Sequence, residues 1–162
     1  MNAPGVRIQQ ATSDDAEEIA CLIGALLGEI MEAIGAKVFN FDTVEATQLL
    51  RRLLGGGRYE AFVARDADGK AVGTITLSES CGLYAGGLFG TIPEFYVDPG
   101  WRSRGVGAAL AAAAHAHARI LGWRRLEVTT PPLPQFDRTL AFYESRGFAV
   151  TGGRKLKLDI RL

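Results

Sequence analysis

Apolar side chains recur every three or four residues in four stretches of the chain, which is the periodicity of helices with one buried face. The predicted helices span residues 13–30, 42–54, 105–121 and 136–145. Runs that favour strands lie at residues 6–9, 59–64, 71–77, 92–97, 125–130, 148–150 and 156–160. In this order the elements predict an α/β (α+β) fold, a mixed sheet of about seven strands with helices on both faces.

Polar residues indicate where two of the helices begin. Ser13 or Asp14 can cap the first helix, and Glu17, three residues after Asp14, completes a capping box. Asp42 and Glu45 have the same spacing at the start of the second helix. Both helices therefore carry their own start signals.

The glycine-rich stretch 78–90 has apolar residues between its glycines. Two interpretations stay open for it, a flexible substrate lid and an ordinary hairpin loop that packs on the sheet. No repeat or low-complexity linker interrupts the chain, so residues 1–162 are predicted to form a single domain.

The strongest chemical signal follows the strand predicted at residues 92–97, where a turn at Asp98 leads to the start of a helix. The first N–H groups of a helix lack carbonyl partners and attract anions. Glycines let a diphosphate approach the backbone, and arginines add charge. The predicted contacts are Arg102, Ser103, Arg104, Gly105, Val106, Gly107 and Ala108. Leu110 replaces the third glycine of a dinucleotide fingerprint, and the Gly-Lys-Ser/Thr of a nucleotide P-loop does not occur.

A strand, an Asp-Pro turn and Arg-x-x-Gly-x-Gly at the start of a helix resemble the acyl-CoA pyrophosphate motif of the GCN5-related N-acetyltransferases (GNATs). Residues 141–148, AFYESRGF, resemble the family's later helix and turn, in which a tyrosine precedes Gly-Phe. The resemblance implies a mostly antiparallel sheet that splits in a V between its fourth and fifth strands. The pantetheine arm of acetyl-CoA would lie in this split, along the backbone of Phe95, Tyr96 and Val97.

The resemblance also implies the reaction, which is transfer of an acetyl group from acetyl-CoA to a primary amine by direct attack in a ternary complex, without a metal. An alkyl amine is mostly protonated at neutral pH, so a base must take a proton. Glu94 is the candidate base, acting directly or through a water, and its alternative roles are binding the ammonium group or being solvated. The N–H of Val97 would polarise the thioester carbonyl.

Two further roles follow from the last predicted helix. Tyr143 stands where the family tyrosine lies near the thioester sulfur, so it is expected to protonate the leaving thiolate, and its alternative role is that of a core aromatic. Phe136 occupies the place of an asparagine that often contacts the cofactor, and Arg138 is the candidate that compensates by binding a phosphate.

The acceptor walls expected from the resemblance, residues 32–41, 78–90 and 131–135, hold aromatics and glycines but few acids. This composition favours a small amine, an amino acid or a peptide over a polycationic aminoglycoside. The alternative function is a non-catalytic acyl-CoA-binding sensor or subunit. A nucleotide or dinucleotide binder is a third hypothesis, disfavoured by Leu110.

Lys plus Arg and Asp plus Glu number 18 each, which favours neither nucleic acid nor an anionic membrane as a partner.

Cys21 and Cys81 are expected to be buried free thiols in a reducing cytoplasm. His117 is expected to be packed with one hydrogen bond and His115 to be exposed. The resemblance implies a possible homodimer through residues 148–160.

Overall fold

The computed structural model describes residues 3–160, and the chain divides into two compact units, Met1–Thr129 and Thr130–Leu162. The first unit contains a sheet and three α-helices, and the second contains one α-helix. The single domain expected for residues 1–162 stays a prediction.

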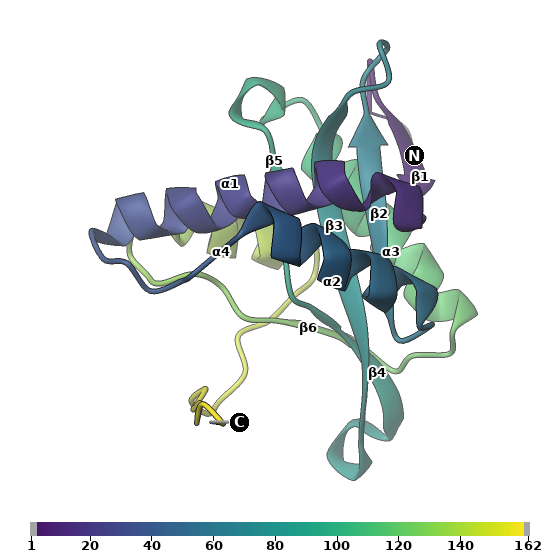
Figure 1. The fold of residues 1–162 in the computed structure, drawn as a ribbon. Helices are drawn as coiled ribbons and strands as arrows, with labels where there is room; N and C mark the ends of the chain where they lie inside the picture. Colours follow the sequence, from purple (N-terminus) through teal and green to yellow (C-terminus); the bar gives the residue numbers. More distant parts are fainter. Residues whose placement is uncertain (1–2, 161–162) are drawn as a thin grey trace. The chain divides into compact units, whose positions relative to one another are not determined.

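A six-stranded sheet forms the framework of the first unit (Figure 1). Its strands are β1 (Arg7–Gln10), β2 (Tyr59–Arg65), β3 (Ala71–Gly82), β4 (Gly87–Ile92), β5 (Phe95–Val97) and β6 (Leu126–Val128). The strand order is β1-β2-β3-β4-β6, and β5 also pairs with β3. Every pair is antiparallel except β4 with β6. The predicted mostly antiparallel sheet is confirmed, with six strands in the described residues where about seven were expected.

Helices cover both faces of this sheet, as predicted. The helices α1 (Ala16–Ile34) and α2 (Thr43–Gly55) lie on one face, and α3 (Val106–Ile120) lies on the other (Figure 1). On the first face a buried cluster joins Ile19, Ile23 and Leu50 of the helices to Ala61 of β2. On the second face the missing side chain of Gly73 lets α3 pack closely on β3, because a Cβ there would lie 3.2 Å from Leu110 Cδ1.

Thr12 caps the start of the first helix, so the prediction of Ser13 or Asp14 was wrong. The Thr12 side chain accepts a hydrogen bond from the N–H of Asp14, while the carboxylate of Asp15 accepts the N–H of Thr12 at 2.7 Å. A short 3-10 turn, Ser13–Asp15, then leads into α1. Burial alone would raise the pKa of Asp15, but hydrogen bonds from Thr12 and from Arg65 of β2 hold that pKa below its ordinary value.

Residues 78–90, for which a lid and a hairpin were both open, form a β-hairpin. Residues 78–82 of β3 pair with residues 87–91 of β4 around the 3-10 turn Leu83–Ala85. The rings of Tyr84 and Phe89 meet edge to face, and the guanidinium of Arg125 stacks over both. The segment therefore extends the sheet as paired strands.

The second unit contains α4 (Asp137–Ser145) and no strand among its described residues. The strands predicted at residues 148–150 and 156–160 were therefore wrong for this structure. A strand needs a neighbour to satisfy its backbone N–H and C=O groups, and no other strand of the second unit offers these segments one. Their apolar side chains are exposed, with Leu156 at 90% and Leu158 at 84%.

Cys21 and Cys81 are free but exposed, so the expectation that they are buried was wrong. His117 is packed, as expected, with its ring edge to face against Phe62, but its Nε2 lies against the carboxylate of Glu60 without forming the expected hydrogen bond. His115 is exposed, as expected. Within residues 3–160 no three or more His, Cys, Asp and Glu side chains gather in a way that could hold a metal ion. None of the described helices has the length and hydropathy needed to cross a membrane.

Candidate active site

Pro93 and Glu94 interrupt the strand that the sequence predicted as one continuous run. The chain pairs as β4 up to Ile92 and resumes pairing as β5 at Phe95, because proline has no N–H to continue a ladder. In the described part of the chain β6 pairs with β4, ending at Val128 opposite Ile92, and β5 pairs with β3 alone. The sheet therefore opens between β5 and β6, which agrees with the predicted V-shaped split.

The outer edge of β5 presents backbone groups away from β3. Asp98, the residue after β5, donates its N–H to the carbonyl of Val72 at 2.9 Å. Hydrogen bonds along an antiparallel strand alternate between its two edges, so Val97 directs its N–H and C=O away from β3. The carbonyl of Val97 accepts a hydrogen bond from Nε of Arg102 at 2.8 Å. This outward backbone is the kind of surface that the expected pairing with pantetheine amides requires.

The loop after β5 gathers unpaired N–H groups at the start of α3. Ser103 and Gly105 adopt positive φ angles of 59° and 83°. The first N–H of the helix to find a carbonyl is that of Ala109, which donates to Gly105 at 3.0 Å. The N–H groups of residues 103–108 donate to no acceptor in residues 3–160. Free donors at the positive end of a helix dipole fit a phosphate group.

The two arginines of this loop have different surroundings. Arg102 donates to both carboxylate oxygens of Glu29 on α1, at 2.8 and 2.7 Å, and lies over the ring of Tyr96. The hydrogen bonds to Glu29 raise the pKa of Arg102. Arg104 stacks 4.7 Å from the ring centroid of Trp101 and forms no ion pair with the described residues. The backbone N–H groups and Arg104 are thus better placed to bind a phosphate than the side chain of Arg102.

Glu94 lies in the break between β4 and β5, and two hydroxyl groups hold its carboxylate. Tyr59 of β2 donates to Oε2 of Glu94 at 2.6 Å, and Oγ1 of Thr76 on β3 contacts the same oxygen. Oγ1 of Thr76 also accepts the N–H of Glu94 at 3.0 Å. Sequence reasoning missed Tyr59 and Thr76, because they are 35 and 18 residues away and no local pattern marks them.

Burial raises the pKa of Tyr59, and the negative charge of Glu94 raises it further. The phenol therefore keeps its proton at neutral pH. It acts as a steady hydrogen-bond donor to the carboxylate.

The second unit places the other two predicted residues on α4. Tyr143 is 5% exposed and meets the rings of Phe142 and Phe148 edge to face. Burial raises the pKa of Tyr143, so its hydroxyl is protonated at neutral pH. Arg138 is exposed. The roles expected for Tyr143 at the thioester and for Arg138 at a phosphate stay predictions.

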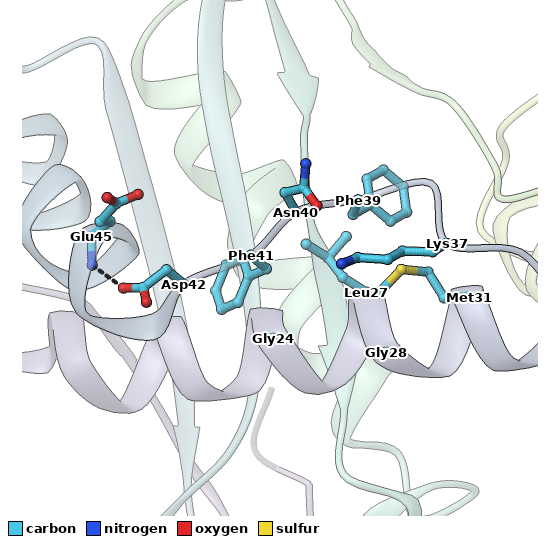
Figure 2. A pocket seen from close by; sticks show the side chains of 10 residues that line it. All are labelled: Gly24, Leu27, Gly28, Met31, Lys37, Phe39, Asn40, Phe41, Asp42 and Glu45. Carbon is cyan, nitrogen blue, oxygen red and sulfur yellow. Dashed lines mark hydrogen bonds between the residues drawn. The ribbon is translucent and has the colours of Figure 1, made fainter.

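A pocket of about 420 Å³ lies between α1 and the segment that leads to α2 (Figure 2). That segment belongs to the connection expected in the acceptor wall, and Asp42 at its end caps α2 by accepting the N–H of Glu45 at 2.9 Å, as predicted. Leu27 and Phe41 in the pocket wall pack against the same buried cluster as Tyr59, which holds Glu94. The side chains around the pocket are apolar (Leu27, Met31, Phe39, Phe41) or polar (Lys37, Asn40, Asp42, Glu45).

A sheet split beside an anion-binding helix start is the architecture expected of an acyl-CoA-binding enzyme. The family model of the acetyltransferase (GNAT) domain matches residues 57–150, which is more than half of the chain. The chain therefore belongs to the GNAT family. It is an acetyltransferase, and the family uses acetyl-CoA as its co-substrate.

Solved structures share this fold over nearly the whole chain. An aminoglycoside acetyltransferase, meta-AAC0020, from an uncultured soil metagenomic sample is 23% identical with a TM-score of 0.74, covering 96% of this chain and 97% of its own. Ribosomal-protein-alanine N-acetyltransferase from Brucella melitensis biovar Abortus 2308 is 24% identical with a TM-score of 0.65, covering 97% and 99%. A GCN5-related N-acetyltransferase from Ralstonia eutropha JMP134 is 20% identical with a TM-score of 0.74, covering 95% and 99%. No curated protein matches the sequence.

Proposed function

We propose that this acetyltransferase transfers the acetyl group of acetyl-CoA to a primary amine of a small molecule, an amino acid or a peptide, by direct attack in a ternary complex. The observation that carries the proposal is the position of Glu94. Its carboxylate is fixed by two hydroxyls three residues before Val97, whose backbone faces the open edge of β5. The proposed base, Glu94, and the strand edge proposed to pair with the pantetheine arm of acetyl-CoA thus lie in one short segment.

In the proposed reaction Glu94 takes a proton from the ammonium group of the acceptor, directly or through a water. The freed nitrogen forms a bond to the thioester carbonyl carbon, while the N–H of Val97 donates to the carbonyl oxygen. The carbon–sulfur bond then breaks, and the thiolate leaves with a proton from Tyr143, while the nitrogen gives up its second proton through water to the Tyr143 phenolate. Glu94 later releases its proton to water, so the enzyme returns to its starting state.

Burial raises the pKa of Tyr143, so its hydroxyl is protonated at neutral pH and is able to donate a hydrogen bond to the leaving sulfur. The phosphates are assigned to the N–H groups of residues 103–108, with Arg104 and Arg138 as side-chain contacts.

The acceptor is assigned to the pocket beside α1. Its charged residues are Lys37, Asp42 and Glu45, and Asp42 already accepts a hydrogen bond within the α2 cap. So few carboxylates suit an acceptor with one amine and an apolar part better than a polycation. The balanced charge of the chain supports a protein without a nucleic-acid or membrane partner, and we propose that it works in the cytoplasm.

The test is release of free thiol from acetyl-CoA over a panel of small amines, amino acids, polyamines, aminoglycosides and short peptides. One amine class is expected to support turnover, and Glu94→Gln and Tyr143→Phe are each expected to lower kcat at least about tenfold. Turnover that neither variant changes would contradict the assigned roles. If acetyl-CoA raises the melting temperature but no amine is acetylated, the non-catalytic acyl-CoA-binding alternative is favoured.

A further inference from the structure

We propose that Tyr59 and Thr76 are positioning residues that fix the carboxylate of Glu94 by its Oε2 atom, so that Oε1 is the atom that accepts the proton of the acceptor amine. The inference rests on the proposed function, in which Glu94 is the base. It adds two residues to the site, and it assigns a different task to each carboxylate oxygen.

The assignment follows from where the hydrogen bonds converge. Tyr59 donates to Oε2 at 2.6 Å and the hydroxyl of Thr76 contacts the same atom. Within residues 3–160 Oε1 of Glu94 has no hydrogen-bond partner. An oxygen with two donors has less electron density to offer to a further proton, so the unoccupied Oε1 is the more basic of the two.

Both holding groups sit on rigid parts of the sheet. Tyr59 opens β2, where it pairs with Ser78 of β3, and its ring packs on the cluster under α1 and α2. Thr76 is fully buried in the middle of β3 opposite Ala61. A glutamate carboxylate rotates almost freely about its last torsion, so hydrogen bonds from two fixed strands restrict it before the substrate arrives. Such support keeps a catalytic group in its productive orientation.

Hydroxyl donors lie against the carboxylate of Glu94 in the described residues. Tyr59 is the titratable side chain that the described residues bring against Glu94, and no Lys, Arg or His among them forms an ion pair with its carboxylate. Because burial and the charge of Glu94 raise the pKa of Tyr59, the phenol donates throughout the working pH range. Donors favour the charged carboxylate without neutralising it as a cation would.

The kinetic test compares Tyr59→Phe with Ser13→Ala, which removes an exposed hydroxyl in the 3-10 turn before α1, outside every segment assigned to the site. Tyr59→Phe is expected to lower kcat about tenfold with the KM for acetyl-CoA unchanged, because the carboxylate of Glu94 loses a donor that orients it. In a Glu94→Gln background the same substitution is expected to have no further effect on kcat. Full activity in Tyr59→Phe, or an equal loss in both backgrounds, would overturn the proposal.

Thr76 is tested by a pair of substitutions that keep its volume or its hydroxyl. Thr76→Val removes the hydroxyl with little change in size and is expected to lower kcat about tenfold, whereas Thr76→Ser is expected to restore at least half of the parent kcat. A role in packing alone predicts the opposite order, because valine fills the buried site better than serine. That opposite order would remove Thr76 from the proposal.

A measurement that does not depend on activity separates failure of this inference from failure of the proposed function. Carbon-13 NMR of labelled glutamate side chains at one fixed pH follows the carboxyl signal of Glu94, assigned with Glu94→Gln, in the parent protein, Tyr59→Phe and Ser13→Ala. The signal is expected to move in Tyr59→Phe, because the carboxylate loses a hydrogen-bond donor, and to stay in place in Ser13→Ala. An unchanged signal in Tyr59→Phe overturns the positioning role even if amines are acetylated. A moved signal without acetylation of any amine retains it and rejects the proposed function.

Discussion

Gly24 lets the aromatic wall of the pocket that we assign to the acceptor approach α1. A Cβ at Gly24 would lie 2.8 Å from Cε1 of Phe41, whereas a Cβ at Gly28, one turn later, would meet nothing within 4 Å (Figure 2). Gly24→Ala must therefore push the ring of Phe41 aside, and Gly28→Ala is the matched control.

Gly24→Ala is expected to raise the KM for the acceptor amine several-fold and to leave the KM for acetyl-CoA unchanged. Gly28→Ala is expected to leave both constants unchanged and to stabilise the protein by about 0.5–1 kcal/mol, because alanine favours a helix. Steady-state kinetics and thermal melts check both variants. An acceptor KM unchanged in Gly24→Ala would place the acceptor elsewhere.

Asp15 gives the stability of the first unit a dependence on acid pH. Its pKa in the folded protein is lowered by Thr12 and Arg65 despite its burial, whereas the unfolded chain titrates near the ordinary value of 3.8. A carboxyl with a lowered folded pKa contributes stability that is complete above the ordinary value and is lost as the pH falls through the folded value.

Asp15→Asn is therefore expected to lower the free energy of unfolding by about 2–3 kcal/mol at pH 7, since Arg65 loses a buried, charged partner and the helix loses part of its cap. The difference from the parent should shrink as the pH falls below about 4. Urea unfolding across a pH series measures it. A difference that stays constant down to the acid end would show that packing, not the ion pair, explains the loss.

At the scale of elements, one ion pair ties α1 to the loop between β5 and α3, to which we assign the phosphates. Glu29 and Arg102 have side chains that are 38% and 41% exposed, and such a pair contributes less than about 1 kcal/mol. The Arg102 guanidinium bridges Glu29 and the carbonyl of Val97, so it links the loop to both α1 and β5.

Glu29→Gln and Arg102→Gln are each expected to weaken acetyl-CoA binding about two- to fivefold, and the double variant is expected to be no weaker than either single variant. Isothermal titration calorimetry measures all three. A much larger loss in Arg102→Gln than in Glu29→Gln would instead mean that Arg102 itself contacts a phosphate, as the sequence motif implied.

Local features, such as a helix cap, could be predicted from the sequence, whereas side-chain contacts that depend on how the strands pair could not. The Asp42 cap and the free N–H groups after Ser103 depend on residues within about one turn, and both could be inferred from the sequence. The cap at Thr12 was missed because several polar residues competed for the same role. The contacts of Tyr59 and Thr76 with Glu94 need the register of three strands, which no periodicity reveals.

On the scale of the whole molecule, the pattern of apolar and polar residues alone could not decide whether residues 156–160 form a strand. Residues 156–160 alternate between apolar and polar side chains as a strand would, yet they form no strand. The run at residues 92–97 also reads as one strand, but Pro93 divides it between β4 and β5. Alternation predicts that a segment can pair, but a strand also requires a partner edge. The structure describes these residues as irregular and exposed.

The exposed apolar side chains at alternate positions of residues 156–160 lead to a prediction about the oligomeric state. Leu156, Leu158 and Ile160 are 90%, 84% and 74% exposed, and these alternate residues would face the same side if the segment formed a strand against a partner. Burying each such side chain contributes about 1.5–3 kcal/mol, so cover by a second copy of the chain is favourable and supports the expected homodimer.

Sedimentation velocity over a wide range of protein concentration is expected to show a dimer that dissociates on dilution. The double variant Leu156→Ser, Leu158→Ser should sediment as a monomer, because it removes most of the apolar surface that a second copy would cover. Val44→Ser, which alters a single 66% exposed side chain on α2, is the control and should sediment as the parent does. A parent protein that is monomeric at every concentration would remove the dimer, and an unchanged dimer in the double variant would place its interface away from residues 156–160.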